Sequence, residues 1–450
     1  MKLKEIVNAL GGVIKAETPF DLAAKKLVID SRKVEEGDIF TALSGENTDG
    51  NLYAEAALKA GAELVIVEDR EVYEKLSGNK VLVRDGLGAI KSLGAYKLRK
   101  YKGTKIAVTG SMGKTSTKEL ISCVLRKKKV YTAYGNYNNE LGVAICAANL
   151  NMRTNCAVFE FGTNSPGEIE QLSLYIKPDI AVLTGIGHAH IGRMGSMEKL
   201  AEEKLSIVKG MNGGTLWVNE TCRMYMNDKI LSAVDVKYFG THMNDDVILA
   251  DAGRNNKEQF YFTAVYMGVP YCFMLNHPYD HFISNSLAAI GIGFELGLGY
   301  KDVMTGVHSF KPVSGRGAIV ELGSIKVIDD TYNAGFESIM SAIKNLGEIN
   351  SPNKYAVIGE MGEIEGFEEM LYLKLYKLAK SLESINFILV GQSYCKFAEA
   401  KNITIAPTKE KANETIALIS EGLVLIKASR ARKFEEFISF IEQEKNKRAV

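Results

Sequence analysis

A glycine-rich turn followed by Lys114 and Thr115 is the part of this chain best suited to chemistry. The short apolar run 106–108 predicts a buried strand before the turn, and a helical pattern follows it as far as residue 124. Backbone N–H groups at such a turn bind phosphate oxygens, a lysine adds positive charge, and a threonine hydroxyl can bind Mg²⁺. We therefore predict a nucleotide-phosphate site made by Gly110, Ser111, Met112, Gly113, Lys114, Thr115 and Ser116.

Further candidates stand at the ends of other predicted strands. Glu160 closes the apolar run 157–159, and the carboxyl ends of strands line the crevice of an open α/β sheet. Because Mg²⁺ prefers oxygen ligands, Glu160 is a candidate metal ligand, and a solvated strand-end glutamate is the alternative. His188 and His190 both follow the next predicted strand, 179–183, and their spacing alone does not choose between them.

Lys204 lies in the middle of an apolar arc on a helix that we predict to begin after Ser196. A lysine on a buried face is rare unless it is paired, and burial lowers its pKa and favours the neutral amine. A neutral amine can take up CO₂ to form a carbamate, which is a negatively charged metal ligand. A lysine that extends its ammonium to solvent at the helix edge is the alternative.

The pattern of strands and helices divides the chain into three units. Residues 1–100 combine short apolar strands with a predicted helix over 53–60. In residues 101–313 strands alternate with helices, apart from polar hairpins over 244–268, which predicts a mostly parallel sheet. Residues 314–450 hold four further strand candidates, typical of a Rossmann-like domain. Those candidates are 326–329, 355–359, 386–390 and 423–426. The expected fold is α/β: a central P-loop-type sheet between a small N-terminal α/β domain and a C-terminal Rossmann-like domain.

Composition excludes several classes of function. The 450 residues carry a net charge of +1, so no overall field favours nucleic acid or a membrane surface. No apolar run reaches transmembrane length. The six cysteines show no Cys-x-x-Cys spacing, which indicates reduced thiols in a cytoplasmic protein. We expect a monomer.

Several motifs, in order along nearly the whole chain, resemble those of the ATP-dependent Mur ligases. The similarity is greatest to the branch that adds D-Ala-D-Ala to a UDP-linked muramyl tripeptide in peptidoglycan synthesis. The motifs are Asp30-Ser-Arg32, Gly45-x-x-x-Asp49-Gly50, Thr109-Gly-Ser-x-Gly-Lys-Thr115, Gly135-Asn-Tyr-Asn-Asn139, Glu160-x-Gly162, Pro166-Gly-Glu168, Gly187-x-Ala-His190 and Asp329-Asp-Thr-Tyr-Asn-Ala334.

The resemblance implies a reaction and its participants. A carboxylate attacks the γ-phosphate of ATP to give an acyl phosphate and ADP, and an amine then displaces phosphate. The implied cofactors are ATP, two Mg²⁺ ions and a carbamylated Lys204. The implied partners are a UDP-linked muramyl peptide and a dipeptide or amino-acid amine, which separate domains enclose before chemistry.

The resemblance also assigns roles to residues. The catalytic set is Lys114, Lys204, His190, Asn138 and Asn139. The metal ligands are Thr115, Glu160, His190 and Lys204. Nucleotide contacts beyond the phosphate turn are Asn285, Arg316 and Asp330, and substrate contacts are Ser31, Arg32, Asp49 and Asn333. Simple turn chemistry is the alternative for Asn138 and Asn139. The stretch Lys427-x-Ser429-Arg430 is similar to a C-terminal Lys-Gly-Ser-Arg pattern of the family, with Ala428 in place of glycine, and a basic helix start is the alternative.

Some residues depart from the family pattern. Phe282 stands where the family has an amide that contacts adenine, and we expect its ring to stack on the base instead. Asn51 replaces a histidine of the UDP-binding segment. Phe336, Glu365 and Tyr372 depart from positions that we expect to face the incoming amine. These three predict an altered amine pocket, in which D-Ala-D-Ala is accepted weakly or a related amine is preferred.

Three other functions remain open at this point. A paralogue of the same class would join a different amine to a different acid. A regulatory nucleotide-binding protein would bind ATP without ligation, which the retained Lys114, Glu160, His190 and Lys204 argue against. A P-loop phosphotransferase would yield a phosphorylated acceptor and no new amide bond.

Overall fold

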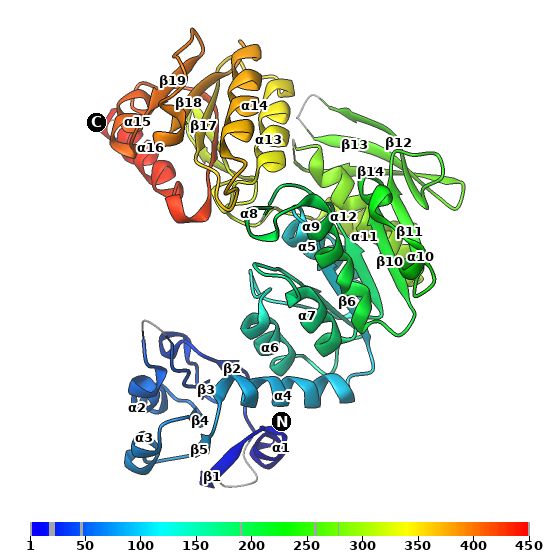
Figure 1. Cartoon of the computed structure of the whole chain (residues 1–450), viewed down its shortest axis with the longest axis vertical. Coiled ribbons are helices and arrows are strands. Elements are labelled where there is room, and N and C mark those ends of the chain that lie inside the picture. The colour runs from blue at the N-terminus through cyan, green and yellow to red at the C-terminus, as the bar shows by residue number, and fades with distance from the viewer. Residues whose placement is uncertain are drawn as a thin grey trace.

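Three β-sheets follow one another along the chain, each covered by its own helices (Figure 1). The computed structural model describes residues 2–17, 23–45, 48–189, 191–255, 259–277 and 279–448. In Figure 1 the N-terminal sheet lies at the bottom, the central sheet to the right, and the C-terminal sheet at the upper left. The expected α/β class with three sheets is confirmed.

The N-terminal sheet has the strand order β1-β5-β4-β3-β2. Strands β2 to β5 pair in parallel, and β1 pairs antiparallel with β5. All four residues of β4 are buried, as expected for a strand with helices or loops on both faces. The strands are β1 (Val13–Glu17), β2 (Leu27–Val28), β3 (Ile39–Thr41), β4 (Leu64–Val67) and β5 (Lys80–Val83), and the helices are α1 (Leu3–Ala9), α2 (Ala54–Lys59), α3 (Arg70–Lys75) and α4 (Gly86–Lys100).

The central sheet has nine strands in the order β14-β13-β12-β11-β10-β9-β6-β8-β7. Strands β6 to β12 pair in parallel. Strands β12, β13 and β14 form antiparallel hairpins that begin in the predicted region 244–268 and end beyond it, because β14 follows that region. The strands are β6 (Thr104–Thr109), β7 (Val130–Thr132), β8 (Cys156–Glu160), β9 (Ile180–Leu183), β10 (Thr215–Asn219), β11 (Asp235–Gly240), β12 (Val247–Arg254), β13 (Phe260–Tyr266) and β14 (Val269–Leu275).

Helices cover both faces of the central sheet because its strands are apolar on both sides. In β6, Ile106 and Val108 pack with α5 and α11, whereas Ala107 packs with α6 and α7. The helices of this unit are α5 (Lys114–Val124), α6 (Glu140–Ala148), α7 (Glu168–Ile176), α8 (Ile191–Met194), α9 (Met197–Leu205), α10 (Asp228–Leu231), α11 (His281–Glu295) and α12 (Tyr300–His308). The carboxyl ends of β6, β8 and β9 therefore meet at one edge, between two helical layers.

The C-terminal sheet has the order β15-β16-β20-β17-β18-β19, and every pair is parallel except β15 with β16. All four predicted strands of this unit are present. The strands are β15 (Ala318–Leu322), β16 (Ile325–Asp329), β17 (Lys354–Gly359), β18 (Asn386–Val390), β19 (Ile403–Ala406) and β20 (Gly422–Lys427), and the helices are α13 (Phe336–Glu348), α14 (Glu368–Ser381), α15 (Lys409–Ile416) and α16 (Glu435–Arg448).

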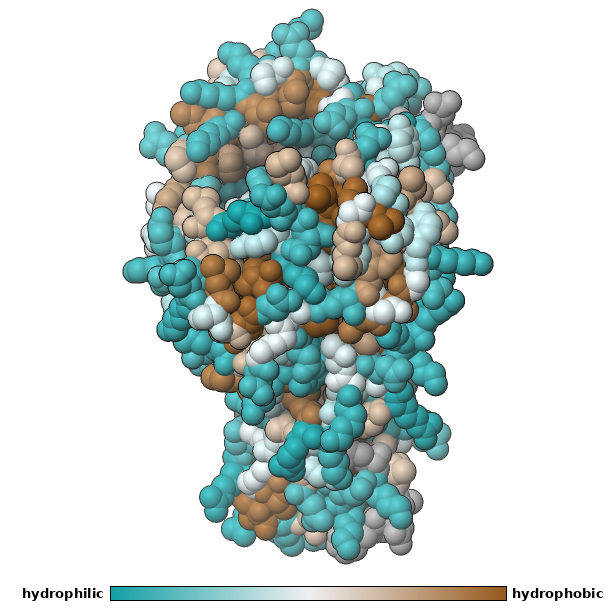
Figure 2. All heavy atoms as spheres, turned by 90° about the vertical axis from the view of Figure 1, so that its right-hand side faces the viewer, coloured by the Kyte–Doolittle hydropathy of each residue, from teal (hydrophilic) through white to brown (hydrophobic). Residues whose placement is uncertain are grey.

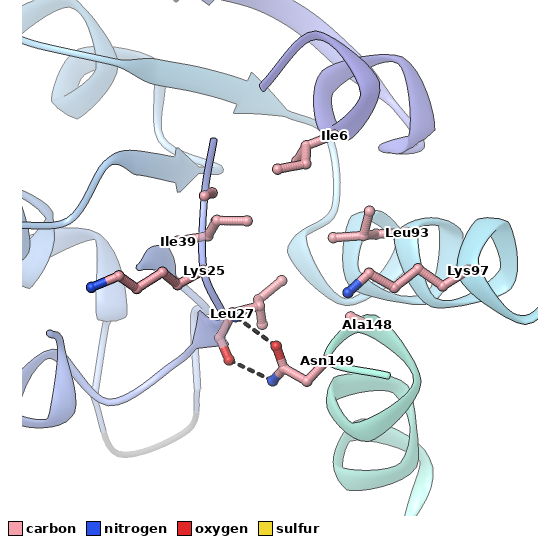
Figure 3. A pocket seen from close by; sticks show the side chains of 9 residues that line it. Ile6, Lys25, Leu27, Ile39, Leu93, Lys97, Ala148 and Asn149 are labelled. Atoms are coloured by element: carbon pink, nitrogen blue, oxygen red, sulfur yellow. Dashed lines mark hydrogen bonds between the residues drawn. The ribbon is translucent and has the colours of Figure 1, made fainter. Parts of the chain in front are cut away.

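The long helix α4 joins the first two units as a packed element. Its residues Ala89, Ile90 and Leu93 share one apolar cluster with Ala144 and other residues of α6. Next to that cluster, the side-chain amide of Asn149 accepts a hydrogen bond from Leu27 N at 2.7 Å and donates to Leu27 O at 2.8 Å (Figure 3). This paired contact fixes the N-terminal sheet against the end of α6.

The surface is predominantly hydrophilic on the face shown in Figure 2, where apolar side chains gather in separate patches. Within the ranges given above, no helix is both long and apolar enough to cross a membrane. All six cysteines are unpaired thiols.

Candidate active site

The phosphate turn connects β6 to α5 and needs glycine at two positions. Gly113 caps α5 with a φ of 76°, a conformation that side-chain-bearing residues rarely adopt. At Gly110 a Cβ atom would collide with Oγ1 of Thr184, the residue after β9. The two glycines bring the N-terminus of α5, with its N–H groups, to the end of β6, where an anion is favoured.

Lys114 is the first residue of α5, and its Nζ donates across the turn to Gly110 O at 2.7 Å. The pKa of Lys114 is lowered to about 8, chiefly by burial and in part by the charge of Arg316, against the opposing effect of the Glu160 and Glu363 carboxylates. Arg316 and Glu363 belong to the C-terminal unit, so the charges of two units meet at this lysine.

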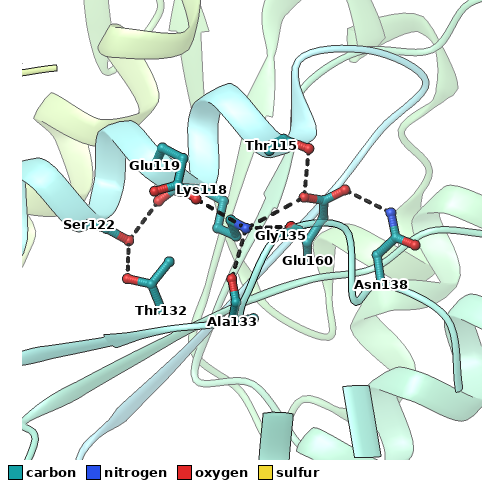
Figure 4. Close-up of polar contacts among 9 residues, drawn as sticks. All are labelled: Thr115, Lys118, Glu119, Ser122, Thr132, Ala133, Gly135, Asn138 and Glu160. Carbon is teal, nitrogen blue, oxygen red and sulfur yellow. Dashed lines mark hydrogen bonds and ion pairs between the residues drawn. The ribbon is translucent and has the colours of Figure 1, made fainter. Parts of the chain in front are cut away.

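Glu160 is the centre of the polar cluster beside the turn (Figure 4). Its carboxylate is 1% exposed at the end of β8 and accepts two hydrogen bonds. Thr115 Oγ1 donates to Oε2 at 2.8 Å, and Asn138 Nδ2 donates to Oε1 at 2.8 Å. The solvated strand-end alternative for Glu160 is therefore wrong. The structure brings together Thr115, Asn138 and Glu160, which the sequence placed in three separate motifs.

Lys118 belongs to the same cluster, and the sequence analysis did not single it out. It is fully buried, and its Nζ donates to Ala133 O at 2.8 Å and Gly135 O at 2.9 Å. The signal that could have found it is helical spacing, since Lys118 follows Thr115 by three residues and so lies on the same helix face.

Asn139 has a different position from its neighbour Asn138. Its Oδ1 accepts a hydrogen bond from Gly142 N at 2.9 Å, and it is the N-cap of α6. For Asn139 the structure thus shows the turn chemistry that we gave as the alternative to a catalytic role.

Lys204 is fully buried on α9, and the predicted N-cap Ser196 accepts a hydrogen bond from Lys199 N. Within the described part of the chain its Nζ has no hydrogen-bond partner. Burial holds the pKa of Lys204 well below its ordinary value, and the positive charge of Lys114 lowers it further, against smaller opposing effects of Glu203 and other carboxylates. The alternative of an ammonium extended to solvent is wrong.

Of the two histidines, His190 lies outside the described residues. His188 contacts the C-terminal unit: its backbone N donates to Glu337 Oε1 at 3.0 Å, and its Nδ1 also contacts that oxygen. Among the residues that the structure describes, no three His, Cys, Asp or Glu side chains are grouped as a metal site. Of the four predicted metal ligands, Glu160 is thus the only such side chain that the structure describes. Thr115 and Lys204 are of other residue types, and His190 lies outside the described residues.

The expected base site lies where α11 approaches the phosphate turn. Asn285 is buried beside Gly113, and in the described part of the chain its Nδ2 has no hydrogen-bond partner. Phe282, by contrast, is fully buried, with its ring centroid 4.8 Å from that of His277 and 5.1 Å from that of Phe310. The expectation that Phe282 stacks on the base is wrong, because its ring is part of the core.

Two more predicted nucleotide contacts lie where the central and C-terminal units meet. The guanidinium carbon of Arg316 lies 3.9 Å from the centre of the Tyr332 ring. Asp330 forms an ion pair with the buried Lys427 at 2.7 Å, and Lys427 also donates to Asn333 O at 2.9 Å. Lys427 closes β20, so it is a buried, paired lysine and the basic-helix-start alternative is wrong for it.

The predicted substrate residues of the N-terminal unit lie on turns after its strands. Arg32 is largely exposed and donates through Nε to Asp30 Oδ1 at 2.8 Å, next to Ser31. Asp49 Oδ1 accepts hydrogen bonds from Asn51 N at 3.0 Å and Asn51 Nδ2 at 2.8 Å. Asn51, the departure from a family histidine, is buried and fixes this turn.

The three departures of the C-terminal unit do not share one pocket wall. Tyr372 is 2% exposed, and its hydroxyl accepts a hydrogen bond from Met361 N at 2.9 Å. The Phe336 ring lies 5.9 Å from the His188 ring, centre to centre, and Glu365 packs against Gly192. Tyr372 is therefore a core residue, whereas Phe336 and Glu365 lie on the seam with the central unit. The expectation of an altered amine pocket is wrong for Tyr372 and stays a prediction for the other two residues.

Comparison with known proteins identifies the family. Residues 108–293 match the Mur ligase middle domain, and residues 24–91 match the catalytic domain of the Mur ligase family. The chain belongs to the Mur ligase family.

Among the relatives, a UDP-N-acetylmuramoyl-tripeptide–D-alanyl-D-alanine ligase from Bacillus subtilis is 30% identical over 97% of both chains. The enzyme of the same name from Escherichia coli is 26% identical over 98% of both. A crystal structure of the MurF ligase from Thermotoga maritima in complex with ADP matches with a TM-score of 0.81 and 27% identity, over 95% of this chain and 99% of that one. A MurF structure from Acinetobacter baumannii matches with a TM-score of 0.80 over 93% of both chains, at 26% identity.

Proposed function

We propose that this chain is an ATP-dependent, ADP-forming ligase that adds D-Ala-D-Ala to a UDP-N-acetylmuramoyl tripeptide. The observation that carries the proposal is the meeting of Thr115, Asn138 and Glu160 beside a phosphate turn, in a chain similar over 97% of its length to a ligase of that name. The same similarity supports a role in peptidoglycan synthesis.

The residues of the phosphate turn suit the first half of this reaction. The peptide carboxylate attacks the γ-phosphorus, the bond to the ADP oxygen breaks, and an acyl phosphate forms. Lys114 and the N–H groups at the start of α5 stabilise the negative charge on the transferring phosphoryl group. In the second half the amine attacks the acyl carbon, loses a proton, and releases inorganic phosphate as the amide forms.

The donor set fits Mg²⁺. Oγ1 of Thr115 and Oε2 of Glu160 lie 2.8 Å apart, and both are hard oxygen donors. We assign one Mg²⁺ to this pair and a second to Glu160, His190 and Lys204. Bound Mg²⁺ would neutralise charge on the phosphoryl oxygens.

A carbamate on Lys204 fits the surroundings of that side chain. Its Nζ is buried, has no hydrogen-bond partner among the described residues, and has a strongly lowered pKa. The neutral amine would form an N–C bond with CO₂ and lose one proton, which gives a carbamate with two oxygens. The negative charge would sit near Lys114, whose positive charge acts on Lys204 in this structure.

The remaining roles follow the resemblance and the division of the chain. We assign nucleotide contacts to Asn285, Arg316 and Asp330, and substrate contacts to Ser31, Arg32, Asp49 and Asn333. We place the domain boundaries at 1–100 for the UDP-substrate domain, 101–313 for the ATP domain and 314–450 for the amine-binding domain. Each segment holds one of the three sheets, which supports this division.

The amine that we propose is D-Ala-D-Ala itself. The expectation of weak acceptance depended on three residues that line one pocket, and the buried Tyr372 does not support it. The names of the similar ligases support D-Ala-D-Ala as the amine. We further propose that the enzyme acts as a cytoplasmic monomer. Unpaired cysteines support a reducing compartment.

The test is a panel of UDP-muramyl peptides and amines with ATP, in which ADP release is measured and products are identified by mass spectrometry. We expect amine-dependent ADP release and a product heavier by one D-Ala-D-Ala residue pair. A preference for another amine would identify a paralogue, a phosphorylated acceptor without an amide would identify a phosphotransferase, and nucleotide binding without turnover would identify a regulatory protein. Each of these three results would overturn the proposal.

A further inference from the structure

Lys118 is a fully buried lysine that no step of the proposed reaction uses, although it lies beside Glu160. Burial of an ammonium group is unfavourable unless each of its donors is satisfied. Here Nζ donates to Ala133 O at 2.8 Å and to Gly135 O at 2.9 Å, and lies 3.2 Å from Glu119 Oε1. Its distance to Glu160 Oε2 is 4.0 Å.

These contacts join α5 to a segment 15 to 17 residues further along the chain. Lys118 lies on α5, one turn after Thr115, whereas Ala133 and Gly135 follow β7 and begin the segment that carries Asn138. Figure 4 shows Lys118 between the helix and this segment, with its ammonium directed at the Glu160 carboxylate. The lysine therefore sets the separation between the phosphate helix and the segment 133–139.

That separation determines how Glu160 is held. Thr115 on α5 donates to one carboxylate oxygen, and Asn138 on the opposite segment donates to the other, both at 2.8 Å. If the two elements moved apart, the two donors could no longer reach the same carboxylate. Two other contacts hold this part of the chain: Thr132 Oγ1 of β7 donates to Ser122 Oγ at 2.7 Å, one helical turn after Lys118, and Gly162 N donates to Asn138 O at 2.8 Å. Of these contacts, only those of Lys118 join α5 to the segment 133–139 itself.

We propose that Lys118 is a positioning residue for ligation: it fixes the segment 133–139 against α5 and so sets the direction of the Glu160 carboxylate. It does not touch substrate or nucleotide in this role. The inference rests on the proposed ligase function. It says that the orientation of the Glu160 carboxylate depends on a residue outside the phosphate-turn motif.

The chain offers a matched control in Lys80 of the N-terminal unit. Lys80 is 6% exposed, and its Nζ also donates to two carbonyl oxygens, Tyr73 O at 3.0 Å and Leu76 O at 2.8 Å. Lys118→Met and Lys80→Met each remove one buried ammonium of this kind and keep a side chain of similar length. A loss of stability is common to both, whereas a change in chemistry is expected only for Lys118.

The experiment measures kcat at saturating ATP, Mg²⁺, UDP-peptide and amine, together with the free energy of unfolding. We expect kcat to fall about 10- to 100-fold in Lys118→Met and by less than about 2-fold in Lys80→Met. Hydrogen–deuterium exchange should rise in the segment 133–139 only in the Lys118 variant. Removing the positive charge of Lys118 near Glu160 would by itself favour Mg²⁺ binding. A loss of kcat that persists at saturating Mg²⁺ therefore indicates a displaced Glu160 carboxylate and not the lost charge.

Lys118→Gln, which keeps an N–H donor, is the second variant if Lys118→Met does not fold. Its fall in kcat is then compared with that of Lys80→Met. Equal kcat in the Lys118 and Lys80 variants would overturn the inference. So would failure of both Lys118 variants to fold while Lys80→Met folds, because Lys118 would then serve the fold alone. A wild-type protein without amine-dependent turnover would instead overturn the proposed function.

Discussion

The hydroxyl of Thr115 donates to the carboxylate of Glu160 at 2.8 Å, which joins the first turn of α5 to the end of β8. These two residues are 45 positions apart in the sequence and meet because β6 and β8 are neighbours in the parallel sheet. Any ligand of the phosphate turn is therefore within reach of both a hydroxyl and a buried carboxylate.

Lys114→Ala should lower kcat by about 10²- to 10³-fold, since it removes a positive donor aimed at the transferring phosphoryl group. The fold should persist, because the lysine lies on a turn and not in the core. The measurements are ADP release at saturating substrates, calorimetric titration with a non-hydrolysable ATP analogue, and thermal unfolding. Arg126→Ala, an exposed charge change just beyond the same helix, is the control. Unchanged turnover and nucleotide affinity in Lys114→Ala would refute the phosphate role.

Lys204 should carry a carbamate when bicarbonate is present. With ¹³C-labelled bicarbonate, NMR should show a carbamate carbon signal that disappears in Lys204→Ala. The reactive group is the buried amine, which has no hydrogen-bond partner among the residues that the structure describes. Lys209→Ala, which removes a neighbouring lysine after α9, should keep the signal. If wild type and Lys204→Ala give identical spectra and identical activity, Lys204 is not modified.

Asn149→Ala should weaken the joint between the N-terminal and central units. It removes both hydrogen bonds to the backbone of Leu27, which should lower the free energy of unfolding by about 1–3 kcal/mol. KM for the UDP substrate should rise because its domain is displaced, while affinity for an ATP analogue stays unchanged. The control is Asn151→Ala, whose hydrogen bonds stay within its own turn. An unchanged KM in Asn149→Ala would show that the joint does not position the substrate domain.

Lys97, also at this joint, supplies a prediction for pH. Burial lowers its pKa to about 8 from the ordinary 10.5, so the folded protein binds the proton less well than the unfolded chain. The resulting penalty is fully present below pH 8 and fades as pH rises toward 10.5. Lys97→Met should therefore raise the free energy of unfolding by about 1 kcal/mol at pH 7, and the gain should shrink at pH 10. Denaturant unfolding at both values tests this, and a gain that is equal at both would contradict the assignment.

The sequence predicted the features that depend on local periodicity and on strand ends. The 100° spacing of apolar residues placed Lys204 in the middle of an apolar arc but left open whether its ammonium reaches solvent, and only the structure shows that it is buried. The alternation of strands and helices predicted the three sheets. The sequence could not distinguish Asn138 from Asn139, because only the fold shows that one meets Glu160 and the other caps α6. Phe282 was misjudged for the same reason: a helix position identifies a buried face but not what packs against it.

Lys118 is a residue that the sequence analysis missed for a similar reason. Its partners Ala133 and Gly135 lie 15 and 17 residues away and offer only backbone carbonyls, which leave no side-chain signature in the sequence. Contacts of this kind become visible only once β7 has been placed beside β8. The residues that position an active site are thus harder to predict than the residues that form it.

The central claim is that the peptide carboxylate is activated as an acyl phosphate before the amine arrives. The direct measurement uses a UDP-muramyl tripeptide whose terminal carboxylate is labelled with ¹⁸O, together with ATP and D-Ala-D-Ala. One labelled oxygen should appear in each inorganic phosphate released, and the amide product should keep the other. Release of unlabelled phosphate alongside the amide product would contradict the account, because the carboxylate oxygen would then never have been bonded to phosphorus.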